Sequence, residues 1–196
     1  MNHPPIPRSF DDLAEVPEQY KNTVDGERFI LFNDEVEGQG RMILFASAQG
    51  LILLQRSETW SCDGTFGVMT EPFLQLYTVM AELDNKSYPC FFGLLPNKRG
   101  ATYSKMLEVL KEAVEAKGPL HLKQVMLDFE ATVIREIKAT FSRQVQVQGC
   151  QVHLFRNWRK KFGEVGNLIT WACAQPSFNK FNKSLHGLCY VPEDKV

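Results

Sequence analysis

The chain has 196 residues, of which 44% are hydrophobic and 11% aromatic, and its formal net charge at pH 7 is −1. This length and apolar content suffice for one sizeable core and argue against a disordered chain. No apolar run reaches the roughly 18 residues of a membrane-spanning helix, and the first residues lack the pattern of a secretory signal. Five cysteines without framework spacing indicate a reducing compartment, so we expect an intracellular protein with no membrane partner.

The first 55 residues are predicted to be a small lead-in segment that contains β-strands. Residues 1–26 carry four prolines and many acids, a composition typical of an extended chain. Two apolar runs, Phe29–Phe32 and Arg41–Ala46, are predicted to be short strands around a glycine turn. Residues 1–40 hold nine acidic and three basic side chains, so their net charge is −6.

Residues 56–165 alternate short strands and helices, which is typical of an α/β domain. One strand is predicted to lead into Asp63. Leu74–Met80 and Cys90–Leu95 are rich in strand-favouring residues. The link between these two strands, Asp84–Pro89, has the composition of a turn.

The period then changes, because apolar residues from Thr102 to Ala116 recur at helical spacing. The next predicted elements are a strand at Val125–Leu127, a helix over residues 130–140, a strand at Val145–Gln148 and a helix from Cys150 to Phe162. The resulting order of elements is β-β-β-α-β-α-β-α. By analogy of fold, this is the order of a ribonuclease-H-like mixed sheet. Residues 166–196 are predicted to be helical pieces that do not return to the sheet.

Asp63 and Asp128 each stand at the end of a strand-like apolar run. In the ribonuclease-H-like topology the fourth strand returns beside the first, so we expect the two carboxylates to meet at one edge of the sheet. Carboxylate oxygens are preferred ligands of hard divalent cations, and a cation held there suits phosphoryl transfer on nucleic acids. The alternative for each aspartate is a turn or capping role, because Asp-Gly after a strand is an ordinary turn signal.

A basic segment follows the second aspartate. Residues 135–161 carry seven basic side chains and one acidic side chain, a net charge of +6. If the region is helical, Arg156, Arg159 and Lys160 share a face, and together with Lys161 they are candidates for contact with DNA backbone phosphates. The alternative is a solvated helix face that happens to be basic.

Several short segments, in this order, resemble the Mutator-like element (MULE) transposases. They are Asp63–Phe66, Pro72–Thr78, Leu94–Lys98, Asp128–Glu130 and Gly149–Leu154. The stretch from Arg28 to Phe45 resembles the segment before the catalytic domain in that family, and Leu185–Val196 resembles the helical insertion that interrupts it. The resemblance covers roughly residues 10–196. It divides the chain into a pre-catalytic segment (1–55), an incomplete catalytic core (56–165) and the start of the insertion (166–196).

The resemblance implies a DDE-type recombinase, which binds terminal inverted repeats and target DNA and uses Mg²⁺ or Mn²⁺ to cleave and join strands. Asp63 and Asp128 match the first two acids of that catalytic and metal-binding set. The third acid, a glutamate, lies beyond the insertion in which this chain ends, so we expect a truncated transposase that is inactive by itself. A DNA substrate implies a nuclear location, and assembly as a homodimer stays open.

Cys150 and His153 match the Cys/His motif that MULE transposases carry between the second and third acids. His186 and Cys189 form a mirrored pair, so a four-ligand zinc site is conceivable, although zinc is not expected because two matched ligands are half of what zinc usually takes. The alternative is a buried Cys150 and a His153 that faces the active-site edge or the DNA.

Three functions stay open on these grounds. The first is a recombinase catalytic domain that works through Asp63, Asp128 and a further glutamate. The second is an inactive, transposon-derived DNA-binding or interaction module. The third is a ribonuclease-H-like nuclease that uses another acid such as Glu130, although we expect that side chain to point along the following helix.

Overall fold

The computed structural model describes residues 9–13, 15–65, 71–164, 174–178, 180–181 and 184. The chain divides into two compact units, Met1–Gln148 and Gly149–Val196. In the first unit two short 3₁₀ helices, Asp11–Leu13 and Glu18–Tyr20, precede the sheet. The elements that follow are β1 (Ile30–Val36), β2 (Gly40–Ala46), α1 (Ala48–Arg56), β3 (Thr59–Thr65), β4 (Gln75–Leu83), β5 (Lys86–Leu95), α2 (Gly100–Glu115), β6 (Gln124–Leu127), α3 (Ala131–Thr140) and β7 (Gln146–Gly149). The second unit contains α4 (Gln151–Glu164).

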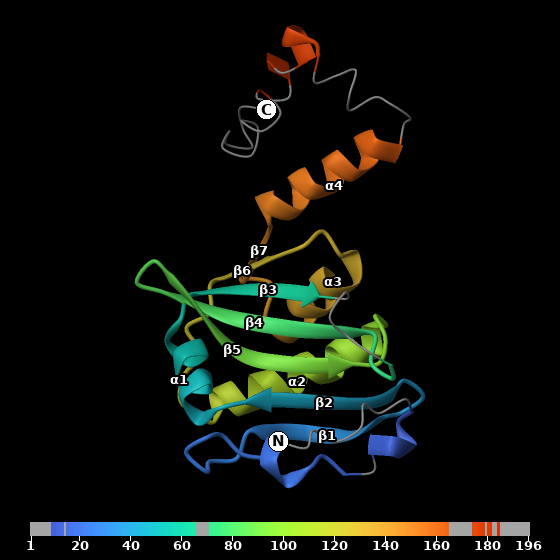
Figure 1. The fold of residues 1–196 in the computed structure, drawn as a ribbon. Coiled ribbons are helices and arrows are strands. Elements are labelled where there is room, and N and C mark those ends of the chain that lie inside the picture. Colours follow the sequence, from blue (N-terminus) through green and yellow to red (C-terminus); the bar gives the residue numbers. More distant parts are fainter. Residues whose placement is uncertain are drawn as a thin grey trace. The chain divides into compact units, whose positions relative to one another are not determined.

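Among the described residues the strands form one seven-stranded sheet in the order β1-β2-β5-β4-β3-β6-β7 (Figure 1). β3, β4 and β5 are joined as an antiparallel meander, and β6 pairs with β3 in parallel. The predicted ribonuclease-H-like mixed sheet is therefore confirmed, including the return of the fourth strand beside the first. β2 pairs with β5, so the hairpin of β1 and β2 extends the same sheet.

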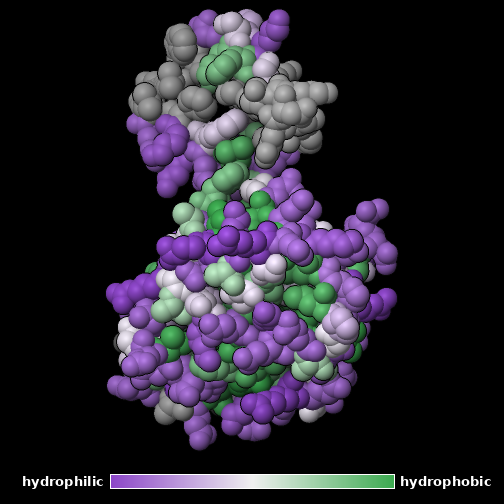
Figure 2. Space-filling model, turned by 180° about the vertical axis from the view of Figure 1, so that it is seen from behind, coloured by the Kyte–Doolittle hydropathy of each residue, from purple (hydrophilic) through white to green (hydrophobic). Residues whose placement is uncertain are grey.

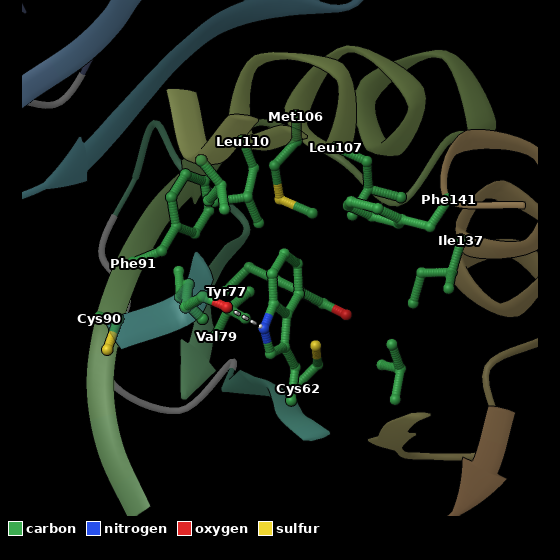
Figure 3. Close-up of a cluster of buried hydrophobic side chains, with 14 of the residues drawn as sticks. Cys62, Tyr77, Val79, Cys90, Phe91, Met106, Leu107, Leu110, Ile137 and Phe141 are labelled. Atoms are coloured by element: carbon green, nitrogen blue, oxygen red, sulfur yellow. Dashed lines mark hydrogen bonds between the residues drawn. The ribbon is translucent and has the colours of Figure 1, made fainter. Parts of the chain in front are cut away.

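The main core lies between one face of the sheet and α1, α2 and α3. Tyr77, Val79 and Ala81 of β4 all point into it, because alternate residues of a strand face the same side. Figure 3 shows how α2 covers this face, with Met106, Leu107 and Leu110 directed at the strands and Ile137 of α3 beside them.

Trp60 of β3 is the largest side chain in this core and is almost fully buried. Its indole Nε1 donates a hydrogen bond to the Leu54 carbonyl oxygen at 3.0 Å, and its ring meets the edge of Phe141 with the centroids 5.3 Å apart. One side chain thereby connects α1, β3 and the end of α3.

The opposite face of the sheet is only partly covered. Val16, Ile30, Ile43 and Phe73 form a smaller buried cluster there, over the end of the sheet that holds β1, β2 and β5. At the other end, alternate residues of β3 and β6 on this face are partly exposed. This partial exposure leaves polar side chains of β3 and β6 accessible.

Two local features differ from the sequence-based prediction. The apolar run Leu51–Leu54 lies in α1, a helix that the pattern did not predict; the Ser47 side chain accepts a hydrogen bond from the Gly50 backbone N–H at its start. The turn before β5 is shorter than the predicted Asp84–Pro89. Asp84 and Asn85 both have positive φ, which makes a tight two-residue hairpin and leaves the next residues paired with β4.

In the part of the chain that the structure describes, no helix is long and apolar enough to cross a bilayer. The surface seen in Figure 2 is mainly hydrophilic, with hydrophobic areas interrupted by hydrophilic side chains. The exposed large hydrophobic side chains among the described residues are Tyr20, Val24, Ile52, Leu74, Phe129, Val152 and Phe181. One of them, Phe129, directly follows Asp128.

The contact between α1 and β5 leads to a first prediction. A Cβ atom at Gly50 would lie 2.8 Å from the backbone oxygen of Cys90, which has no room to move aside. In an exposed helix Gly→Ala stabilises by about 1 kcal/mol, but here we expect Gly50→Ala to lower the free energy of unfolding by about 1–3 kcal/mol through overpacking. Urea denaturation measures the change. Gln49→Ala, at an exposed position of the same helix, should stay within about 0.5 kcal/mol of the parent, and a stabilised Gly50→Ala would contradict the close contact.

Candidate metal-binding site

The parallel pairing of β3 and β6 aligns the two aspartates. Ser61 pairs with Met126, and Asp63 and Asp128 each follow two residues later. Because alternate residues share a face, Asp63 lies on the partly exposed side of β3, while Trp60 and Cys62 point into the core. Asp128 follows Leu127, a buried residue of β6, and is itself partly exposed. The structure therefore puts the two predicted acids at corresponding positions, Asp63 within β3 and Asp128 directly after β6.

Asp63 lies inside β3, and the antiparallel ladder with β4 holds its backbone opposite Thr78. Its Oδ2 accepts a hydrogen bond from the Thr65 hydroxyl at 3.3 Å. The neighbouring Cys62 is buried on the opposite side of the strand, and burial raises the pKa of its thiol to about 12. The thiol is therefore neutral at physiological pH and faces away from the acid pair.

Asp128 lies in a tight turn between β6 and α3. Its Oδ1 accepts a hydrogen bond from the Phe129 backbone N–H at 2.7 Å, and its carbonyl oxygen accepts one from the Glu130 backbone N–H at 2.8 Å. The paired register of β6 with β3 extends as far as Met126. The turn, rather than strand pairing, therefore sets the orientation of Asp128.

Glu130 is the N-cap residue of α3, and its side chain contacts α2. The Tyr103 hydroxyl donates a hydrogen bond to Glu130 Oε1 at 2.9 Å, and Lys98 Nζ lies 3.8 Å from Oε2. The expectation that Glu130 points along the following helix is therefore wrong. The reason is that the Tyr103 hydroxyl of α2 and the Lys98 ammonium group of the loop before α2 attract the carboxylate toward α2.

Tyr103 connects Glu130 to β4 through a buried polar contact. The Gln75 side-chain Nε2 donates a hydrogen bond to the Tyr103 hydroxyl at 2.8 Å, and both residues are fully buried. Burial raises the pKa of Tyr103 well above its usual value, so the hydroxyl is a neutral donor. The sequence pattern does not single out these residues, because each occupies a position that periodicity assigns to the core. A polar group at such a position is the signal that identifies them.

The loop before α2 is organised by Asn97, in the segment Leu94–Lys98 that carried part of the family resemblance. Its Oδ1 accepts hydrogen bonds from the Arg99 backbone N–H at 2.9 Å and from the Thr102 hydroxyl at 2.8 Å. Its Nδ2 donates to the Gln39 carbonyl oxygen at 2.7 Å, which connects the loop to the turn between β1 and β2. Asn97 therefore sets the start of α2 and the place of Lys98.

The remaining predicted site residues lie in the second unit, at the start of α4 and along it. Cys150 is a free, partly exposed cysteine that directly precedes α4, and His153 lies three residues further. Arg156, Arg159 and Lys160 are exposed on the predicted helix, whereas Lys161 forms an ion pair with Glu164 at 2.7 Å. Phe66, His186, Cys189 and most of residues 166–196 lie outside the described residues, so the mirrored pair proposed for zinc and the predicted insertion are not tested.

Within the described ranges, no three or more histidine, cysteine or acidic side chains form a group that could hold a metal ion. Asp63 and Asp128 are a pair of hard oxygen donors, and they suit a cation that completes its shell with water and substrate phosphate, as Mg²⁺ does.

A family model for the MULE transposase domain matches residues 59–157, which run from the start of β3 into α4 and include both aspartates. The match covers just over half of the chain, and it confirms the resemblance found in the short segments. No curated protein matches the chain. The order of the strands, the alignment of the two acids and the family match agree, and the chain belongs to the MULE transposase domain family.

Proposed function

We propose that this chain takes part in DNA transposition and that Asp63 and Asp128 are two ligands of a divalent cation, Mg²⁺ or Mn²⁺. The observation that supports the proposal is the parallel register of β3 and β6, which puts Asp63 of β3 and Asp128, the residue after β6, at matching positions along the two strands. A bound cation would stabilise the charge that develops on the attacking and leaving oxygens when DNA strands are cleaved and joined.

The donor chemistry of the pair fits such a cation. Both groups are carboxylates on the partly exposed face of the sheet, and Mg²⁺ and Mn²⁺ prefer oxygen ligands. The nearest soft ligand, the Cys62 thiol, is buried on the other side of β3. Asp63 is held by the strand ladder and Asp128 by its turn, so each carboxylate keeps its position while substrate phosphate supplies further oxygens.

The proposed DNA partners are terminal inverted repeats and target DNA, which would place the chain in the nucleus. Arg156, Arg159 and Lys160 are exposed on α4, and their spacing puts them on one face of the helix. Long basic side chains on one helical face are suited to the phosphates of the DNA backbone rather than to base edges. Lys161 contributes less under this proposal, because its ammonium group is paired with Glu164.

A second candidate is a DNA-binding or interaction module without chemistry. It is favoured by the finding that the described residues contain no group of three potential metal ligands. The two candidates differ in what the aspartates do: the first needs them for a metal, whereas the second leaves DNA binding independent of both carboxylates and of metal.

The first test measures Mn²⁺ binding to the full 196-residue chain by titration followed with electron paramagnetic resonance. We expect Asp63→Asn and Asp128→Asn each to weaken Mn²⁺ binding by at least about 10-fold, because each removes a charged oxygen ligand. Asp34→Asn is the matched control, since Asp34 is an exposed carboxylate on β1, at the opposite edge of the sheet. It should leave the affinity unchanged.

Failure of the parent chain to bind Mn²⁺ would reject the metal-dependent function. Gel-shift binding of DNA by both asparagine variants in the presence of a chelator would then favour the module without chemistry.

The second test concerns α4 and the salt dependence of DNA binding. Replacing Arg156, Arg159 and Lys160 with glutamine should reduce the slope of log affinity against log salt by about 1 for each lost phosphate contact. Fluorescence anisotropy with a labelled duplex gives this slope. Lys161→Gln should change it much less because of the ion pair with Glu164. An unchanged slope in the triple variant would mean that this face of α4 is a solvated surface that makes no contact with DNA phosphates.

A further inference from the structure

Glu130 is held by partners from two segments that are distant from it in sequence. The Tyr103 hydroxyl of α2 and the Lys98 ammonium group of the preceding loop reach the two oxygens of its carboxylate. About a quarter of the Glu130 side chain is exposed, against 42% for Lys98. The hydrogen bond with Tyr103 is thus the better shielded of the two contacts.

The hydrogen bonds from β4 to Glu130 have a fixed direction. The Gln75 amide nitrogen can only donate, so the Tyr103 oxygen accepts from it, and the single hydroxyl hydrogen is directed at Glu130. Gln75 and Tyr103 are both fully buried. Neither can exchange its partner for water, so the position of the hydroxyl is well defined.

Glu130 is in turn coupled to Asp128 through the backbone. Its N–H donates to the Asp128 carbonyl oxygen at 2.8 Å, and the N–H of the intervening Phe129 donates to Asp128 Oδ1 at 2.7 Å. A displacement of Glu130 therefore rotates the same turn that orients the Asp128 carboxylate.

The use of glutamate at this position runs against local helix preference. Ser, Thr, Asp and Asn are the favoured N-cap residues because their short side chains accept from the first turn. Glu130 occupies the N-cap of α3 and makes no such bond. Its carboxylate instead contacts Tyr103 of α2. A residue that departs from the N-cap preference in this way is expected near a functional site, where its contacts matter more than local helix stability.

From these contacts we infer that Glu130 is a positioning residue, which acts through the Tyr103 hydroxyl to hold the Asp128 turn in the geometry that binds the cation. The inference rests on the proposed function, because it assigns a support to the proposed ligand Asp128. Glu130 is not itself a ligand under this inference.

Mn²⁺ affinity of the folded 196-residue chain tests the inference. Tyr103→Phe removes only the hydroxyl, and Glu130→Asp keeps the charge but shortens the reach to Tyr103, so each should weaken Mn²⁺ binding by about 10-fold. Glu130→Gln keeps an oxygen that can accept from Tyr103 and loses only the exposed contact with Lys98, so it should weaken binding much less. The Tyr103→Phe, Glu130→Asp double variant should bind Mn²⁺ as weakly as either single variant does, because both substitutions remove the same hydrogen bond between Tyr103 and Glu130.

Tyr77→Phe is the matched control. Tyr77 is a second buried tyrosine, with its ring 5.8 Å from that of Tyr103 between centroids, and its hydroxyl lies beside the Cys62 thiol. It should leave the Mn²⁺ affinity unchanged. Thermal unfolding without metal reports the folded fraction of each variant, so a loss of stability is separated from a loss of affinity.

Three results would overturn the inference. If Tyr103→Phe and Glu130→Asp bind Mn²⁺ as the parent does while Asp63→Asn does not, the positioning role fails and the proposed function stands. If Glu130→Gln abolishes binding and Tyr103→Phe has no effect, Glu130 is a ligand instead. If the parent chain does not bind Mn²⁺, the proposed function and the inference both fail.

Discussion

The parallel pairing of β6 with β3 is the contact on which the rest of the first unit depends. β4 occupies one edge of β3 through the meander, so β6 takes the remaining edge. To reach that edge from β5 the chain has to cross the sheet, and α2 makes the crossing. The apolar side of α2 is buried on the strands as a result. Formation of the core and alignment of Asp63 with Asp128 are therefore two consequences of the same pairing.

Besides covering the sheet, α2 contributes a hydrogen bond from its first turn to the region around Asp128. Its buried face is apolar except near its start, where Thr102 and Tyr103 have hydrogen-bond partners. Buried polar groups cost stability unless they are paired, and these are paired with Asn97, Gln75 and Glu130. The polar end of α2 thus lies against the turn that holds Asp128, and its apolar remainder lies against the strands. One helix provides the core and the support of the candidate site.

Much of the fold was predictable because it follows local periodicity. The helical spacing of apolar residues predicted α2 and α3, and strand-like runs predicted the strand that contains Asp63 and the strand that ends at Leu127. α1 was not predictable in the same way. A short apolar run such as Leu51–Leu54 suits a buried strand and a buried helix equally, and here the Ser47 cap and the close approach of Gly50 to β5 accompany the helix.

The sequence by itself determined the order of most strands and helices, the association of both aspartates with strands, and the family; β3 runs past Asp63 to Thr65. These properties depend on residue types and on spacing over a few turns or strand residues. Only the tertiary structure decided the register of β3 with β6 and the partners of Glu130. Gln75 and Tyr103 are 28 residues apart, and Tyr103 and Glu130 are 27 apart. Hydrogen bonds between residues so distant in the chain form only when strand pairing and helix packing bring the residues together. Local sequence patterns therefore do not predict these bonds.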